Sequence, residues 1–163
     1  MEKPEITAYR LCVGIMLLNA KGEAWIGRRF EKQDDDGVGK WWQMPQGGVD
    51  EGEDLLAAAT RELYEETGVK TASMIAESKA WHTYDLPAQL IGKSWKGKYR
   101  GQKQKWFAFR FEGQEGEITL KVPGQSQEFD LWRWAKKGEL LELIIPFKRQ
   151  VYEGVLAEFS HLI

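Results

Sequence analysis

The 163-residue chain has a single cysteine, Cys12, and no apolar run close to the roughly 20 residues that a membrane-spanning helix needs. One cysteine excludes an internal disulfide and a cysteine-built metal site, and it fits a reducing cytosol. The first residues, Met1 to Glu5, contain no hydrophobic signal core. These absences predict a cytoplasmic protein that makes no contact with a membrane.

The chain also lacks a large net charge, because 23 Lys and Arg residues nearly balance 25 Asp and Glu residues and leave a formal charge of -2. That balance argues against a protein that coats nucleic acid uniformly. Internal repeats, low-complexity tracts and Pro- or Ser-rich linkers are absent from the sequence. Since 42% of the residues are apolar, we expect a single domain over residues 1–163 with a sizeable core.

Hydrophobic patterning predicts an α+β domain in which a mixed sheet carries two principal helices. The first helix is expected over residues 54–67, with Gly68 as its left-handed cap. The second is expected to start at Pro146 and to end near Ser160. The expected strands cover residues 11–18, 23–29, 41–44, 73–84, 102–111, 118–122 and 129–135.

Three glutamates of the first predicted helix form the most informative pattern. Glu62, Glu65 and Glu66 stand at positions i, i+3 and i+4, so their carboxylates share one helix face within about one turn. Like charges at this spacing repel each other, and a bound cation offsets the repulsion. Hard oxygen ligands suit Mg²⁺ or Mn²⁺. Taken alone, the triplet also fits an ordinary solvated acidic face.

The residues around the triplet extend the pattern. The segment from Gly47 to Val69 reads Gly-x5-Glu-x7-Arg-Glu-Leu-x-Glu-Glu-x-Gly-Val. It resembles the signature of the Nudix hydrolase family at every specified position. The predicted setting of a strand, a Gly-rich loop and a helix agrees with that resemblance.

The resemblance implies a Nudix fold, an α/β/α sandwich on a mixed central sheet, and hydrolysis of a nucleoside diphosphate linked to another group. It implies that Glu62, Glu65 and Glu66 bind a divalent metal that contacts phosphate oxygens and lowers the pKa of the attacking water. It further implies that Arg61 pairs with a carboxylate, either Glu53 or Glu65, and orients this helix face.

One further glutamate and one glycine complete the implied site. Glu128 ends a loop just before the strand predicted over 129–135, where the resemblance implies that it binds metal, accepts a proton from the attacking water, or does both. A plain surface carboxylate is the alternative. The Gly47 carbonyl is implied as an additional metal ligand.

Other segments narrow the resemblance to the branch of the family that holds bacterial RNA pyrophosphohydrolases and dinucleoside polyphosphate hydrolases. The resemblance extends from about Tyr9 to Phe159. The segments that carry it are 42–48, 101–107, 128–134 and 146–152. The loop from Glu31 to Lys40 and the sequence Trp42-Gln43-Met44-Pro45 look more like the dinucleoside polyphosphate hydrolases.

A cationic segment between Gly92 and Phe107 supports a polyphosphate substrate, because it holds six cations and no carboxylate. A solvated basic loop is the alternative. Alternation predicts that Lys103 and Lys105 point to one sheet face and Gln102 and Gln104 to the other. The lysines share their face with three following phenylalanines, so they must lie at its open end unless a bulge intervenes. The six cations are Lys93, Lys96, Lys98, Arg100, Lys103 and Lys105.

The resemblance also implies where the substrate binds. Phe147 and Lys148 are implied to contact the base, although Phe147 also fits the apolar stripe of the last helix. Arg10 and Arg29 are implied to lie near the phosphates and the base. The full set of implied substrate contacts is Arg10, Arg29, Lys103, Lys105, Phe147 and Lys148.

These patterns together predict a Mg²⁺-dependent pyrophosphohydrolase, with Mn²⁺ as a possible substitute. The expected substrates are the 5′ end of triphosphorylated RNA, dinucleoside polyphosphates such as diadenosine tetraphosphate, or both. A housecleaning hydrolase of free nucleotides or nucleotide sugars and a non-catalytic nucleotide-binding module are the alternatives. The expected catalytic residues are Arg61, Glu62, Glu65, Glu66 and Glu128.

Overall fold

The computed structural model describes residues 8–29, 41–91 and 98–163. Within them the strands are β1 (Tyr9–Leu18), β2 (Ala24–Arg29), β3 (Trp42–Gln43), β4 (Gln46–Gly48), β5 (Ala72–Glu77), β6 (His82–Asp85), β7 (Gly101–Phe111) and β8 (Phe129–Ala135). The α-helices are α1 (Leu55–Thr67), α2 (Lys137–Leu143) and α3 (Arg149–Glu158), and short 3₁₀ turns are formed by η2 (Glu115–Glu117) and η3 (Pro146–Lys148).

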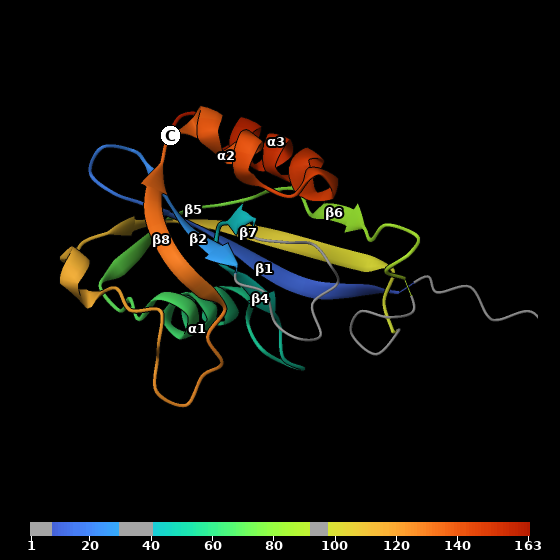
Figure 1. Ribbon diagram of the computed structural model, residues 1–163, viewed down its shortest axis with the longest axis horizontal. Coiled ribbons are helices and arrows are strands. Elements are labelled where there is room, and N and C mark those ends of the chain that lie inside the picture. The colour runs from blue at the N-terminus through green and yellow to red at the C-terminus, as the bar shows by residue number, and fades with distance from the viewer. Residues whose placement is uncertain (1–7, 30–40, 92–97) are drawn as a thin grey trace, which may run out of the picture.

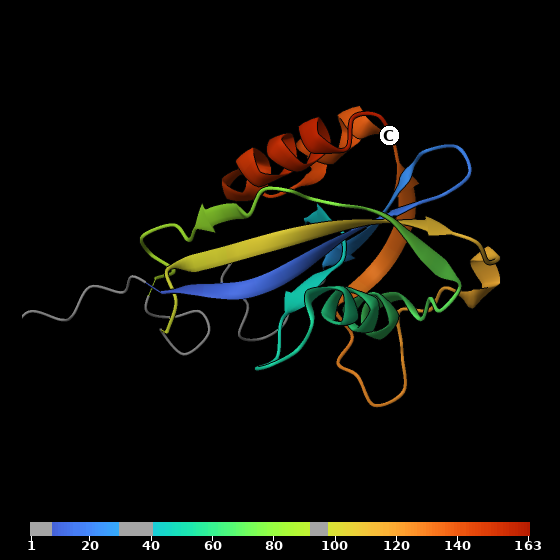
Figure 2. The same cartoon turned by 180° about the vertical axis from the view of Figure 1, so that it is seen from behind.

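The strands form one mixed sheet in the order β3-β2-β1-β7-β5. Three further strands extend it, since β4 pairs with β1, β6 with β7, and β8 with β2. Among the strand pairs of the described residues, β1 and β7 run parallel and the others run antiparallel. Helix α1 covers one face of the sheet, whereas α2 and α3 cover the other (Figures 1 and 2). The predicted α+β sandwich on a mixed sheet is therefore confirmed.

β1 is the central strand, and it is buried on both faces as its continuous apolar sequence predicts. Its side chains alternate between two core clusters. Val13 and Ile15 pack with Leu63 of α1, and Met16 packs with Val155 of α3 on the opposite face. The sheet thus separates an α1-side core from an α3-side core, and each can position functional groups on its own face.

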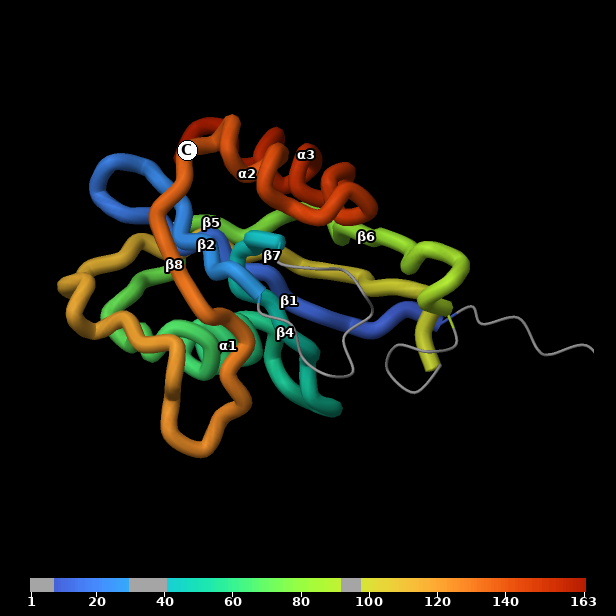
Figure 3. The backbone as a smooth tube through the Cα atoms, in the orientation of Figure 1, coloured from blue at the N-terminus to red at the C-terminus, as the bar shows by residue number. Residues whose placement is uncertain are grey.

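One predicted strand, at residues 118–122, is wrong. Ile118 and Leu120 pack against the α1-side core and Val122 is buried, so the alternation reflects burial. The backbone bonds elsewhere, because the Thr119 N–H donates to the carbonyl of Thr67 at the end of α1. Figure 3 shows this part of the chain passing on the α1 side of the sheet before it enters β8.

Four other features differ from the sequence prediction. The expected strand at 73–84 is divided into β5 and β6, because the register shifts after Met74 and the Trp106 N–H of β7 donates to the Ser78 hydroxyl where a longer strand would offer a backbone carbonyl. The three-residue strand β4 and the seven-residue helix α2 were not predicted, since both are too short for a periodic pattern. Pro146 opens a 3₁₀ turn, and α3 follows it.

Candidate active site

Helix α1 carries the acidic face, and both of its ends are capped as the sequence predicts. The Asp54 carboxylate accepts a hydrogen bond from the Ala57 N–H, and Gly68 adopts a left-handed conformation with φ of 75°. Ala59 and Leu63 are buried in the α1-side core. This packing fixes the rotation of the helix, and it places Glu62 and Glu66 against β4.

Arg61 donates hydrogen bonds to several carboxylates of this acidic face. It pairs with Glu53 through two hydrogen bonds of 2.8 and 2.9 Å, and it donates to Glu62 at 2.8 Å and to Glu65 at 3.1 Å. A further bond of 2.9 Å reaches the carbonyl of Gly48 in β4. Hydrogen bonds from Arg61 lower the pKa of Glu53 to about 2. The predicted pairing of Arg61 with Glu53 or Glu65 is confirmed for both residues.

Glu66 is the buried member of the carboxylate group. Burial raises its pKa well above the usual value, and the nearby charges of Glu62 and Glu128 add to that effect. Its carboxylate accepts a hydrogen bond from the backbone of Gln46, but Oε2 has no hydrogen-bond partner among the described residues. A buried oxygen of this kind calls for a positively charged ligand.

Glu62 lies against Gly47 and requires a glycine there. A Cβ at Gly47 would stand 2.0 Å from the Glu62 carboxyl carbon, so any side chain would displace the carboxylate. Burial raises the pKa of Glu62 to about 7, against the opposing effect of Arg61. The predicted ligands Glu62, Glu66 and the Gly47 backbone therefore lie together at β4, and Glu128 interacts electrostatically with Glu66.

Within the described residues, no group of three or more His, Cys, Asp or Glu side chains is arranged to hold a metal ion as it stands. Arg61 holds two of the predicted ligands, Glu62 and Glu65, by hydrogen bonds. The donor set nevertheless suits a divalent ion, since Glu66 presents an unpartnered buried oxygen beside further carboxylates. Binding would require Glu62 and Glu65 to turn partly away from Arg61.

Three of the predicted cationic contacts, Arg10, Arg29 and Lys148, lie near Tyr84, whose ring belongs to the α3-side core. Arg10 lies over Gly48, where a Cβ would stand 2.5 Å from Nη2 of the guanidinium. Burial raises the pKa of Tyr84, and the positive charges of Arg10 and Arg29 oppose that rise. Both arginines therefore lie near Tyr84. Lys148 is only 6% exposed, and its Nζ lies 5.5 Å from the centre of the Tyr84 ring.

Phe147 completes this group. Its ring centre lies 5.7 Å from that of Tyr84 and 6.0 Å from the Lys148 ammonium. The side chain is half-buried against the α3-side core, so it belongs both to the core and to the edge of the cationic group. The structure thus brings together Arg10, Arg29, Phe147 and Lys148 around Tyr84, a residue that the sequence analysis missed.

Lys103 and Lys105 lie elsewhere. β7 pairs with β1 in regular register, and both lysines point to the α1 side at the open end of the face, as alternation predicts. Their ammonium groups lie 5.0 and 5.5 Å from the centre of the Trp81 ring. Gln102 and Gln104 are buried on the opposite face. The predicted contact of the two lysines with substrate stays a prediction, and it requires a substrate that reaches the α1 side.

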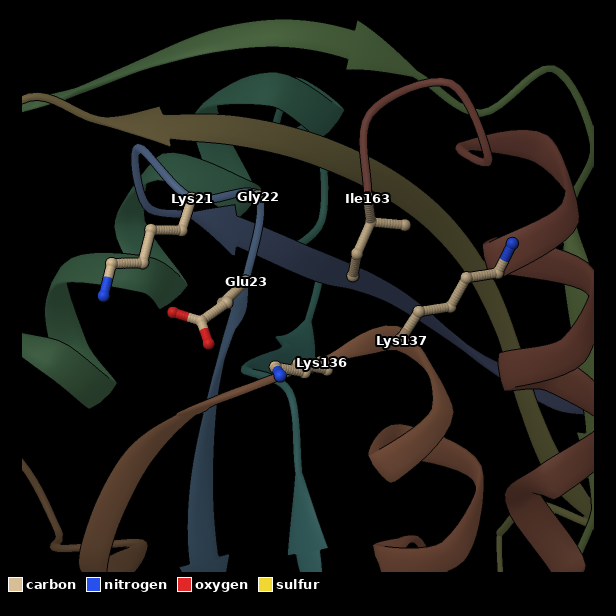
Figure 4. A pocket seen from close by; sticks show the side chains of 6 residues that line it. All are labelled: Lys21, Gly22, Glu23, Lys136, Lys137 and Ile163. Atoms are coloured by element: carbon tan, nitrogen blue, oxygen red, sulfur yellow. The ribbon is translucent and has the colours of Figure 1, made fainter.

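Some predicted features fall outside the described residues. They include the loop from Glu31 to Lys40 and the cations Lys93 and Lys96. A separate pocket of about 290 Å³ lies by the turn between β1 and β2 and the start of α2 (Figure 4). It contains no predicted site residue and is lined by Lys21, Gly22, Glu23, Lys136, Lys137 and Ile163.

Residues 8–155 match the family model described as the NUDIX domain. The chain belongs to the Nudix family. The Nudix signature over Gly47 to Val69 therefore predicted the family correctly. Nudix hydrolases generally need a divalent metal, which agrees with the unpartnered oxygen of Glu66. In the described part of the chain, no helix is long and apolar enough to cross a membrane.

Relatives of this Nudix chain include an RNA pyrophosphohydrolase of Agrobacterium fabrum, which is 57% identical over 98% of this chain and 96% of the relative. An RNA pyrophosphohydrolase of Brucella anthropi is 56% identical over 98% of this chain and 94% of the relative. Among solved structures, the E. coli dihydroneopterin triphosphate pyrophosphohydrolase matches with a TM-score of 0.66 at 19% identity, covering 93% and 99% of the two chains. The C. elegans Ap4A hydrolase matches with a TM-score of 0.61 at 15% identity, covering 92% and 98%. These two structures support the fold.

Proposed function

We propose that this chain is a Mg²⁺-dependent RNA pyrophosphohydrolase that removes pyrophosphate from 5′-triphosphorylated RNA, and that it also hydrolyses dinucleoside polyphosphates such as diadenosine tetraphosphate. One observation carries the proposal. At the adjacent residues Gly47 and Gly48, the Glu62 carboxylate lies on one side of β4 and the Arg10 guanidinium on the other. A chain of phosphates that crosses this point meets carboxylate ligands for metal and a cation for its own charge. The names of the relatives from Agrobacterium and Brucella support the same reaction.

In this proposal, the Gly47 carbonyl and the carboxylates of Glu62, Glu65, Glu66 and Glu128 would hold Mg²⁺. When bound, the ion offsets charge on the phosphate oxygens and lowers the pKa of the attacking water. Arg61 keeps Glu62 and Glu65 on one side of the helix by direct hydrogen bonds. Glu128, which lies near the buried Glu66, is assigned as the group that takes a proton from the water.

The cationic group on the α3 side binds the rest of the substrate. Arg10, Arg29 and Lys148 offset the charge of the phosphates, and they gather around Tyr84. Phe147 offers an aromatic face to the first base. Because this group contacts phosphates and one base, it is compatible with both an RNA end and a dinucleoside polyphosphate.

We further infer that residues 1–163 act as a single Nudix domain. Cys12 is unpaired with any other cysteine and is buried, which fits a reducing compartment. The cytoplasm is therefore the proposed location.

The experiment is a direct comparison of substrates. Turnover of a triphosphorylated RNA oligomer, of diadenosine tetraphosphate and of free nucleoside triphosphates is measured with Mg²⁺ and with Mn²⁺. We expect the first two to be hydrolysed faster than the free nucleotides. Faster hydrolysis of free nucleotides or nucleotide sugars would favour the housecleaning alternative, and no metal-dependent phosphate release from any substrate would favour a binding module.

The residue assignment is tested with one matched pair of variants. Glu66→Gln removes a proposed metal ligand, and Glu51→Gln makes the same chemical change at an exposed position of the signature loop. We expect Glu66→Gln to lower kcat at least about 100-fold, because charge stabilisation at a reacting phosphate is worth several kcal/mol. Turnover within a few-fold of wild type at saturating Mg²⁺ would show that the ligand set is wrong.

A further inference from the structure

Four buried or half-buried side chains on the α3 side of the sheet form a connected hydrogen-bond network. The Trp106 Nε1–H donates to Oε1 of Gln104 at 2.9 Å. The Gln104 Nε2 group donates to Oε1 of Gln102 at 2.7 Å and to Oε1 of Gln46 at 3.0 Å. Trp106 and Gln104 are at most 1% exposed. Neither residue belongs to the site described above.

The chemistry of the indole fixes the direction of every bond in this network. An indole N–H can only donate, so it must face the carbonyl oxygen of the Gln104 amide. The NH₂ group of Gln104 must then face outward, and Gln46 and Gln102 must present their carbonyl oxygens to it. Their own NH₂ groups therefore point away from Gln104.

Trp106 can impose this direction because it is itself held firmly. The six-membered ring lies flat over Gly14, where a Cβ would stand only 2.3 Å away. Its other side meets Tyr152 edge-on, with ring centres 5.7 Å apart. Tyr152 is fixed in turn, since its hydroxyl accepts a 2.7 Å hydrogen bond from the Met44 N–H.

The two outer glutamines flank Arg10. Gln102 is paired directly with Arg10 across β1 and β7, and with Tyr84 across β6 and β7. Gln46 stands two residues before Gly48 in β4, and so it shares the sheet face over which Arg10 lies. The NH₂ groups of both glutamines are therefore available where the proposed polyphosphate crosses from Arg10 toward the carboxylates.

We propose that Trp106 and Gln104 are positioning residues that turn the carboxamides of Gln46 and Gln102 so that both donate N–H to phosphate oxygens bound at Arg10. The inference rests on the proposed function, because a polyphosphate is the ligand. A free carboxamide presents an oxygen as readily as an NH₂ group, and an oxygen repels phosphate. The network fixes the orientation of both carboxamides before the substrate binds, so the two glutamines do not need to rearrange on binding.

The main test is Gln104→Glu. A carboxylate at this position still accepts from Trp106, but it cannot donate, so Gln46 and Gln102 turn their NH₂ groups inward to it. We expect KM for triphosphorylated RNA to rise about tenfold or more, since a hydrogen bond to a charged group contributes at least that factor, while kcat changes less. The control is Gln114→Glu, which adds the same charge at an exposed position beyond the other end of β7. We expect this control to match wild type.

A double-mutant cycle separates positioning from a general effect on structure. Gln46→Met alone removes one donor and raises KM. In the Gln104→Glu background the Gln46 amide already points inward, so the second change should add less than about twofold. Independent, multiplying effects would overturn the proposal, as would a Gln104→Glu enzyme with wild-type KM.

The role of the network can also be tested by binding measurements that do not depend on turnover. Calorimetric titration with inorganic tripolyphosphate in metal-free buffer should give a Kd at least about tenfold weaker for Gln104→Glu than for wild type. If Gln104→Glu does not fold, Trp106→Phe removes the fixed N–H donor together with part of the buried ring. This variant should also bind tripolyphosphate more weakly, whereas an unchanged Kd would refute the network. A wild-type enzyme that leaves triphosphorylated RNA uncleaved would refute the proposed function, and the tripolyphosphate titration would still decide the role of the network.

Discussion

At the scale of single residues, the site depends on two neighbouring glycines that serve opposite faces of β4. Gly47 leaves room for the Glu62 carboxylate, and Gly48 leaves room for the Arg10 guanidinium. The signature in the sequence marks Gly47 but gives no reason for Gly48. The reason is visible only when β1 lies beside β4, with Cys12 paired to Gly48.

Gly48→Ala is therefore expected to impair substrate binding more than folding. The new Cβ would meet Nη2 of Arg10 at 2.5 Å, and this atom ends a flexible side chain that can move aside. We expect KM for triphosphorylated RNA to rise several-fold with a change in melting temperature of only a few degrees. Gly116→Ala is the control, because a Cβ there meets nothing within 4 Å. Unchanged KM in Gly48→Ala would argue against a role for Arg10 in binding.

Glu53 predicts an acid-dependent loss of stability. Its pKa is about 2 in the folded protein because Arg61 hydrogen-bonds the charged form, whereas the ordinary value is 4.5. Because the folded protein favours the charged form of Glu53, this carboxylate contributes its full free energy of stabilisation above about pH 4.5. That contribution is lost as the pH falls toward 2. Thermal unfolding of wild type and of Glu53→Gln should differ most above pH 5, and the difference should shrink steadily between pH 4.5 and pH 2. A difference that stays constant over that interval would contradict this assignment.

At the scale of elements, local signals predicted the structure where they were strong, and packing decided the rest. Helix α1 was predicted to within one residue because Asp54 and Gly68 are both effective caps. The segment 118–122 had the alternation of a strand, but its backbone bonds to the end of α1. Neither β4 nor α2 carries enough residues for a recognisable period, although β4 holds Gly47 and Gly48.

The contact between β1 and β7 makes Gly14 a structural requirement. A methyl group at this position would lie 2.3 Å from the buried Trp106 ring, which is held by Tyr152 and cannot move freely. We expect Gly14→Ala to lower the free energy of unfolding by about 1–3 kcal/mol, as overpacking of a core typically does. Urea denaturation measures the effect, and Gly138→Ala in α2 is the control because its Cβ meets nothing within 4 Å. Equal stability of the two variants would show that Trp106 is less constrained than its contacts indicate.

At the scale of the whole molecule, the proposed site joins both faces of the sheet. The metal-binding half comes mainly from one stretch of sequence, residues 47–66, so its spacing is recognisable from the sequence alone. The cationic half is assembled from β1, β2, β6 and η3, which are far apart in the chain. Resemblance suggested Arg10, Arg29 and Lys148, but no spacing could reveal that Tyr84 lies between them. Alternation placed Lys103 and Lys105 on a common face, but it could not show that this face lies opposite the cationic group.

Removal of the bound metal should lower the melting temperature of the protein without unfolding it at ordinary temperature. Arg61 donates hydrogen bonds to Glu62 and Glu65 and offsets part of their mutual repulsion, so the protein in a chelating buffer should keep its fold. In the proposed function Mg²⁺ binds the carboxylate cluster of the folded protein. At about 100 times its Kd the ion should then add about 2.7 kcal/mol of stability, visible as a rise in melting temperature. The rise should disappear in Glu66→Gln, which lacks the proposed buried ligand, and persist in Glu51→Gln. An equal rise in all three proteins would mean that Mg²⁺ stabilises the chain at some other place, and the carboxylate face of α1 would lose its assigned role.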